Sequence, residues 1–289
     1  MRYLYGASIQ GIQDFIFKTN KLKEIVGASE IVKEIEGFFA KNYQPKVLLR
    51  NAGGNIKAIF DEDECKRVVL NFPKEIMQQA YGITLSQAVV KMEGEFEDED
   101  KANIEIERVL RIQRNKPTVP LDLSLGIMKL NPSTAKPVVG YRKIQKESTA
   151  IDRVTSQKLD AYDRLLKQKP HLKKFREIKD FSNGKNKIAV IHADGNGLGK
   201  LVPLLGDELS SFSQSLEMAT KEAFAMAKRN YMDIRDVILG GDDMVIICNA
   251  NNALEFTQNF LQNFENETSK IDAIKRLKRE GKIDFSKER

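Results

Sequence analysis

The chain is poor in the side chains that bind metals through sulfur or imidazole. Its 289 residues include two cysteines, two histidines and no tryptophan. Cys65 and Cys248 lie within apolar or helical patterns, which argues against a disulfide scaffold or a cysteine zinc site and for a reducing cytoplasm. His171 and His192 are too few for a multi-histidine site. Any bound metal would therefore need oxygen ligands, which suit a hard cation such as Mg²⁺ or Mn²⁺.

Long apolar runs are missing as well. No stretch approaches the roughly 18–20 uninterrupted apolar residues of a membrane span. The opening residues, MRYLYGASIQ, lack the order of a signal peptide. The sequence therefore predicts a cytoplasmic protein without membrane contact. A hydrophobic content of 41% beside a charged content of 30% is typical of a folded core with a solvated surface. The length favours two domains.

Positive charge is concentrated in the middle of the chain. The formal net charge is +6, and between Arg142 and Lys179 twelve Lys or Arg residues stand against five Asp or Glu residues. Such a segment can contact the phosphates of nucleotides or RNA. It can equally be the solvated face of a surface helix, and the sequence leaves both interpretations open.

The first 92 residues alternate between strand and helix patterns. The order strand, helix, strand, strand, helix, strand is that of a ferredoxin-like α+β domain, an antiparallel sheet with helices on one face. We expect the long first helix to break near Gly27. The predicted elements are residues 2–9, 12–41, 46–51, 55–60, 61–79 and 83–92.

A middle segment, residues 93–186, separates this domain from a second one. It begins with an acidic run at 93–100 and continues with a predicted helix at 102–115 and a predicted strand at 121–130. From Lys146 to Lys179 we expect a basic and largely helical stretch.

The remainder, residues 187–289, repeats the same order of elements. A strand at 186–193 ends at DGNGLGK, a helix follows at 209–229, a hairpin at 237–247 and a helix at 253–267. The sequence shows no convincing final strand, so we expect this domain to be cut short before its sixth element.

The hairpin VILGGDDMVII poses the functional question. Gly and Asp are favoured at turns, so the motif alone predicts no more than a turn. The first domain contains a counterpart, LLRNAGGNIKAIF. Aligning Ala7 with Ala193 and Gly11 with Gly197 places Ser8 opposite Asp194. The hairpin glycines Gly53-Gly54 fall opposite Gly240-Gly241, which places Asn55-Ile56 opposite Asp242-Asp243. The separations are 47 and 48 positions. The acids are therefore present only in the second copy, which favours a chemical role for them over a folding role.

The three acids have a physical reason to bind metal. In a ferredoxin-like sheet the first strand lies beside the central hairpin, so Asp194 can approach Asp242 and Asp243. Three crowded carboxylates repel one another unless a divalent cation offsets them. Two such cations can activate a hydroxyl and stabilise departing pyrophosphate. The nearby glycines let backbone amides approach phosphates, with Lys200 following. We expect His192, on the same strand, to be buried and structural.

These motifs resemble the polymerase-like large subunit of type III CRISPR complexes and its stand-alone relatives. Members carry two ferredoxin-like palm domains, the second with an Asp-ended first strand and a GGDD hairpin, and they join ATP into cyclic or linear oligoadenylate messengers in antiviral defence. The segment SIQGIQDFIFKTNKLKEIVGASEIV is similar to the first palm of that family. By this resemblance residues 1–92 are a degenerate first palm and residues 187–289 a second palm.

The resemblance also implies roles for individual residues. Asp194, Asp242 and Asp243 would be catalytic metal ligands, together with Gly195. The nucleotide would be bound by both palms, and CRISPR effector subunits, RNA or a second copy of the chain are the partners that the family leaves open. The nucleotide-binding residues would be Gly195, Asn196, Gly197, Gly199, Lys200, Ser213, Gly240 and Gly241, with Gly11 and Gln13 in the first palm.

Three features depart from the family pattern, and two alternatives stay open. We find no histidine–aspartate nuclease segment before the first palm, no cysteine zinc site between the palms and no C-terminal helical domain. One alternative is a scaffold that binds nucleotide or RNA without turnover. The other is a diguanylate cyclase, which is disfavoured because the hairpin has GGDD, with Asp in place of Glu, and because two palms already share one chain.

Overall fold

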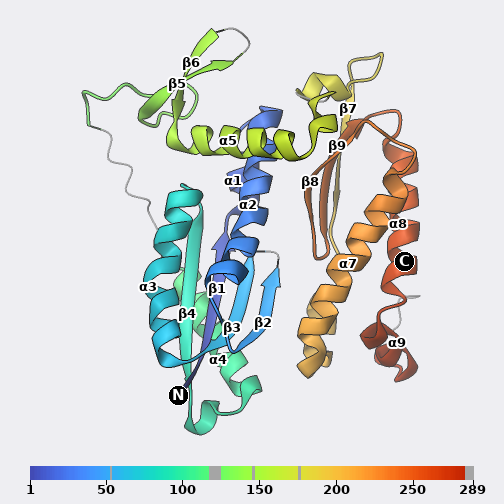
Figure 1. Cartoon of the computed structure of the whole chain (residues 1–289). Helices are drawn as coiled ribbons and strands as arrows, with labels where there is room; N and C mark the ends of the chain where they lie inside the picture. The colour runs from blue at the N-terminus through green and yellow to red at the C-terminus, as the bar shows by residue number, and fades with distance from the viewer. Residues whose placement is uncertain (53, 117–124, 145–146, 175–176, 284–289) are drawn as a thin grey trace. The chain divides into compact units, whose positions relative to one another are not determined.

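The computed structural model describes residues 1–52, 54–116, 125–144, 147–174 and 177–283 (Figure 1). The chain divides into two compact units, which we call the first unit, Met1–Lys173, and the second unit, Lys174–Arg289. Each is described by itself below.

A four-stranded antiparallel sheet forms the centre of the first unit. Its strand order is β2-β3-β1-β4, which is the ferredoxin-like order and confirms the α+β prediction. β1 lies in the middle and pairs with β3 on one side and β4 on the other. The elements that build this domain are β1 (Arg2–Gln10), α1 (Ile12–Phe17), α2 (Leu22–Asn42), β2 (Val47–Ala52), β3 (Asn55–Phe60), α3 (Glu62–Gln79) and β4 (Thr84–Met92).

Aromatic side chains fill the core between this sheet and helices α2 and α3. Tyr5 and Phe60 come from the sheet, and Phe39 and Phe72 come from the helices. Their ring centroids lie between 5.1 and 6.3 Å apart. All four are fully buried, and edge-to-face pairs of this kind add about 0.5–1.5 kcal/mol each beyond burial. This core fixes β1, and therefore the loop that follows it.

The opposite face of the sheet is covered too. Helix α4 (Glu99–Arg114), which follows the one-turn helix η1 (Gly94–Phe96), packs Ile106 and Leu110 against Leu4 and Val90. Gly6 makes room for it, because a Cβ at that position would lie 3.0 Å from Ile106 Cδ1. The sequence predicted helices on one face only. The apolar stripe of α4 needs a partner, and the second sheet face supplies it.

The long N-terminal helix does not break at Gly27. α1 ends at Phe17 and α2 begins at Leu22. The break therefore comprises residues 18–21 and lies before the expected position at Gly27. Gly27 is required for packing: a Cβ there would lie 1.8 Å from the backbone oxygen of Lys158 in α5 (Arg153–Gln168). α5 crosses α2 at this contact (Figure 1).

The stretch beginning at Lys146 is less helical than predicted. β5 (Val138–Ile144) and β6 (Glu147–Asp152) form an antiparallel hairpin, and α5 starts only at Arg153. The β-branched Thr149 and Ile151 suit a strand. Asp152 then begins the helix by accepting from the backbone N–H of Thr155 at 2.9 Å. Of the strand predicted at 121–130, residues 121–124 lie outside the described residues, and Leu130 forms only an isolated bridge to Pro137.

The second unit is built around a three-stranded antiparallel sheet of order β7-β9-β8. Helices α7 and α8 pack against it through Phe224, Phe256 and Phe260, which meet Met244 and Ile246 of the central strand. Among the described residues, this order matches that of β1, β3 and β2 in the first unit. The elements are η3 (Ile178–Phe181), β7 (Ile188–Ala193), α6 (Leu198–Leu201), η4 (Val202–Leu204), η5 (Gly206–Glu208), α7 (Leu209–Lys228), β8 (Ile234–Gly240), β9 (Asp243–Asn249), α8 (Ala253–Thr268) and α9 (Asp272–Arg279), with η2 (Pro170–Lys174) before them.

Candidate metal and nucleotide site

Strand pairing brings the three predicted acids to one end of the second sheet. β7 ends at Ala193, which pairs with Met244 of β9, so Asp194 follows directly beside Asp243. Gly240 of β8 pairs with Asp243, which leaves Gly241 and Asp242 as the two-residue turn. Gly241 has φ +61°, a conformation that favours glycine. The turn glycine thus allows a tight hairpin whose tip carries adjacent carboxylates.

The three carboxyl groups interact with one another. Partial burial raises the pKa of Asp243, and the neighbouring charges of Asp242 and Asp194 raise it further. Asp194 and Asp243 are also linked by a side-chain hydrogen bond. Nearby His192 acts in the opposite direction and lowers that pKa. Negative charge is therefore concentrated at this point of the sheet.

The donor set at the hairpin suits a hard divalent cation. All three side chains offer carboxylate oxygens, the ligands that Mg²⁺ and Mn²⁺ prefer. Among the described residues, however, no three His, Cys, Asp or Glu side chains stand in a complete metal-binding arrangement. The donors fit a hard cation in kind, and the strand pairing brings Asp194 and Asp243 side by side.

A glycine seats the side chain of Asp242. A Cβ on Gly195 would lie 2.6 Å from Asp242 Cβ and 3.0 Å from its Oδ2. Asp242 thus leans onto the bare backbone of Gly195, the residue after Asp194. Any larger residue at position 195 would push this carboxylate away from its two neighbours.

The first unit has the opposite arrangement at the equivalent place. Ser8 pairs with Asn55, and the Ser8 hydroxyl donates to Asn55 Oδ1 at 3.0 Å. Gly54 is the hairpin residue, and a Cβ on it would lie 2.6 Å from Ile12 Cδ1 and 3.3 Å from Ile9 Cβ. In the first unit, strand one supplies the side chain of Ile9 and the hairpin supplies Gly54. In the second unit, Gly195 and Asp242 take these places. An acid at Gly54 would not fit.

This pairing corrects the sequence alignment of the hairpins by one residue. Asn55 corresponds to Asp243, because Ala7 pairs with Ile56 as Ala193 pairs with Met244, and Asn55 and Asp243 each precede that partner by one residue. The alignment on the paired glycines had placed Asn55 opposite Asp242. Two GG dipeptides invite that choice, but backbone register, which sequence does not reveal, decides it. The conclusion that the first copy lacks all three acids is unchanged.

The loop after β7 carries most of the other predicted residues. Gly197 has φ +83° and precedes α6, just as Gly11 has φ +63° and precedes α1. Asn196 and Lys200 are exposed around this turn, and Gly199 lies within α6. Ser213 lies on α7, half-buried, one turn before the core residue Leu216. The structure thus places Gly195, Gly240 and Gly241 at the acids. The roles of the loop residues and Ser213 stay predictions.

His192 is exposed, so the expectation of a buried structural histidine was wrong. It lies on β7 two residues before Asp194, and Val190, on the same face of the strand, is 59% exposed. Strand alternation puts both side chains on the face away from α7 and α8.

A cavity of about 250 Å³ lies in the first unit beside Gly11. It is lined by Lys18, Lys136 and Lys158 and by the acids Glu24 and Asp152, among others. Gln13, the other residue predicted for this palm, is exposed and lies outside the lining.

Sequence reasoning missed two buried polar residues. Thr220 of α7 is fully buried, and its hydroxyl lies 2.5 Å from the carbonyl oxygen of Gly241. Lys158 of α5 is 3% exposed and donates to the backbone oxygen of Phe15 at 2.5 Å. A polar residue within an otherwise apolar helical face is the only sequence signal for either.

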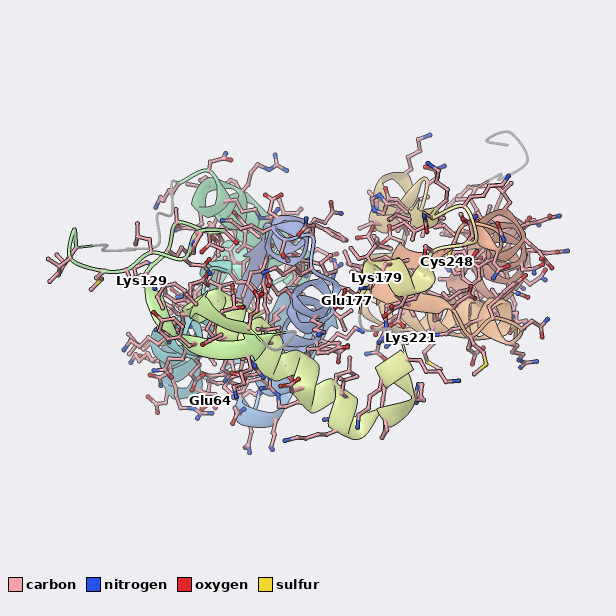
Figure 2. All side chains as sticks on the ribbon, turned by 90° about the horizontal axis from the view of Figure 1, so that it is seen from above. Glu64, Lys129, Glu177, Lys179, Lys221 and Cys248 are labelled. Atoms are coloured by element: carbon pink, nitrogen blue, oxygen red, sulfur yellow. The ribbon has the colours of Figure 1, made fainter. Side chains whose placement is uncertain are left out.

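The basic segment from Arg142 to Lys179 does not form one helical surface. Its residues are spread over β5, α5 and short helices of both units. Arg142 pairs with Asp160 at 2.8 Å, and Arg164 is paired with Glu34 at 2.7 Å. Lys179 is likewise paired with Glu177 at 3.3 Å; both residues are labelled in Figure 2. No helix within the described residues is long and apolar enough to cross a membrane.

Comparison with known proteins identifies the second unit. Residues 187–286 match the sequence profile of the second palm domain of Cas10/Cmr2. The resemblance to the polymerase-like large subunits of type III CRISPR systems is thereby confirmed. No protein with a curated description matches the sequence.

Solved structures extend the likeness beyond the Cas10/Cmr2 palm segment. A Csm1–Csm4 cassette in complex with AMPPNP matches with a TM-score of 0.60 and 14% identity, covering 93% of this chain and 48% of that one. The cassette in complex with cA4 gives 0.59 and 13%, with the same coverage. Csm1 from T. onnurineus gives 0.55 and 15%, covering 93% and 46%. At these low identities, the TM-scores show a shared fold alone. The chain spans about half the length of these relatives.

Proposed function

We propose that this protein is a metal-dependent nucleotidyltransferase that joins ATP into cyclic or linear oligoadenylates. The observation that carries the proposal is the local exchange between the two sheets. In the second unit, glycine at position 195 admits the Asp242 carboxylate beside Asp194 and Asp243. In the first unit, Ile9 and Ile12 fill the equivalent space. A turn alone would not need this difference.

Each residue at the hairpin has a definite task in such a reaction. Asp194, Asp242 and Asp243 would hold divalent cations, with Gly195 beside them. When bound, such cations lower the pKa of an attacking ribose hydroxyl and stabilise the departing pyrophosphate. The glycines at 195 and 197 would let the backbone amides of this loop approach a triphosphate. Lys200 adds positive charge near that loop, and Ser213 would contact the base.

Two further observations support an adenine nucleotide as substrate. The structures that share this fold include Csm1–Csm4 cassettes in complex with AMPPNP and cA4. The first unit also has a cavity at Gly11, the residue equivalent to Gly197, and lysines line it. We infer that this cavity serves a second nucleotide. CRISPR effector subunits are the partners that the same fold relatives suggest.

The test is an incubation of the protein with each NTP and Mg²⁺ or Mn²⁺, with products resolved by mass spectrometry. We expect oligoadenylate from the parent chain and none from the Asp242→Ala/Asp243→Ala variant. The matched control is Asp272→Ala, since the Asp272 side chain is 98% exposed on α9 of the same unit.

The alternatives give different products. Cyclic di-GMP made from GTP would replace the proposal with a diguanylate-cyclase activity. Nucleotide binding with no product under any metal would favour a non-catalytic scaffold. Oligoadenylate made equally by the double variant would show that these acids do not carry the reaction.

A further inference from the structure

The turn that carries Asp242 is attached to helix α7 by one side chain. The hydroxyl of Thr220 lies 2.5 Å from the carbonyl oxygen of Gly241 and 2.9 Å from that of Leu216. A carbonyl cannot donate, so the hydroxyl must be the donor in either bond. The bond to Leu216 is the ordinary one within a helix. The bond to Gly241 joins residues 21 positions apart and reaches the residue before Asp242.

The bond from Thr220 to Gly241 lies where no solvent molecule can readily take its place. Thr220 is fully buried, and water therefore has little access to replace it as a donor. Its neighbour Ala219 is buried, and Ala223, one turn further along α7, belongs to the core cluster between that helix and the sheet. The helix is thus held firmly against the strands. The turn at Gly241, in contrast, is half-buried and extends beyond the paired residues.

Thr220 also stands on the same side of α7 as Ser213. The two are seven residues apart, which is two helical turns or about 10 Å along the axis. One helix face therefore bears the residue expected to contact the base and the residue that holds the hairpin. If Ser213 contacts the base as proposed, Thr220 would hold the Gly241-Asp242 turn at a set position relative to it.

We propose that Thr220 is a positioning residue that sets the place of the Gly241-Asp242 turn and so brings Asp242 into register with Asp194 and Asp243. The inference rests on the proposed function, because it assumes that these acids bind a divalent cation. Thr220 acts through the backbone of Gly241.

The experiment is a titration of the full chain with Mn²⁺ alone, in which the free ion is counted by electron paramagnetic resonance. Thr220→Val removes the hydroxyl while keeping the shape of the side chain, and Thr220→Ser keeps the hydroxyl. We expect the dissociation constant for Mn²⁺ to rise about ten-fold in Thr220→Val, since one buried hydrogen bond is lost, and to stay near the parent value in Thr220→Ser. Thr257→Val is the matched control, because Thr257 donates to Ala253 within α8 at 2.7 Å.

Two further comparisons make the result decisive. Circular dichroism and the melting temperature show whether each variant is folded. If Thr220→Val is unfolded, Thr220→Ala, without a hydroxyl, is compared with Thr220→Ser, which has one. Asp242→Asn/Asp243→Asn should lose Mn²⁺ binding. If it binds as the parent does, or if the parent binds no Mn²⁺, the metal site and the proposed function are overturned. If only the double variant loses Mn²⁺ and folded Thr220→Val binds like the parent, the role of Thr220 alone is overturned.

Discussion

Replacing Gly195 with alanine tests the geometry of the hairpin site with one methyl group. The new Cβ would lie 2.6 Å from Asp242 Cβ. Carbon atoms in contact normally lie about 3.5–4.0 Å apart, so one of the two backbones or the Asp242 side chain must move by about 1 Å. Misplacing a catalytic group by that distance costs about 10²-fold in rate. Gly195 is not one of the glycines with a positive φ, so the backbone at this position can accept alanine.

The assay follows pyrophosphate release from ATP at saturating Mn²⁺, beside thermal unfolding of the same preparation. We expect Gly195→Ala to lower turnover about 10²-fold with little loss of stability. Gly184→Ala, in the same unit, is the control, since nothing lies within 4 Å of its added Cβ. A folded Gly195→Ala variant with turnover within about three-fold of the parent, far below the effect expected of a 1 Å displacement, would refute the argument that this glycine seats Asp242.

Two predictions concern the first unit. Gly27→Ala should lower the free energy of unfolding by about 3 kcal/mol or more, as an overpacked contact does, because its Cβ would lie 1.8 Å from the Lys158 oxygen. The control is Gly37→Ala in the same helix. Its Cβ meets nothing within 4 Å, so this variant should raise the free energy of unfolding by about 0.5–1 kcal/mol. Urea unfolding measures both, and equal effects would contradict the close packing of α2 on α5. Burial lowers the pKa of Lys158 to about 8 from 10.5. Between these values the unfolded chain keeps a proton that the folded chain gives up, so stability rises with pH. Between pH 7.5 and pH 10, the free energy of unfolding of the parent should therefore rise by about 2 kcal/mol relative to that of Lys158→Met. A constant difference over that range would show that Lys158 is solvated.

Hydrophobic periodicity was sufficient to predict the two ferredoxin-like sheets. The 3.6-residue pattern of residues 61–79 describes a helix that buries one face, whereas β1 is buried on both faces because α4 covers the second one. The exceptions arise where distant parts of the chain meet. Gly27 looks like a helix breaker, but it is a contact surface for α5. The strand Glu147–Asp152 lies in a charged stretch and gains its order from pairing with β5.

The candidate site was predictable in its residues but not in its geometry. Asp194, Asp242 and Asp243 follow from comparing the two copies, because the first copy keeps the turn and lacks the acids. The strand register, which pairs Asn55 with Ser8, cannot be read from the sequence. It makes Asn55 the counterpart of Asp243, one residue from the match that the glycines suggested. Thr220 was missed, since a buried threonine in a helix has no local pattern that marks its distant acceptor.

The central claim is that the carboxylates at the GGDD hairpin bind a divalent cation beside a nucleotide. The most direct measurement is an anomalous difference map from crystals grown with Mn²⁺ and a non-hydrolysable ATP analogue. We predict a peak bonded to carboxylate oxygens of Asp194, Asp242 and Asp243, with the triphosphate at the loop that follows β7. A triphosphate bound elsewhere, or a nucleotide at this loop with no manganese at the three acids, would contradict the account.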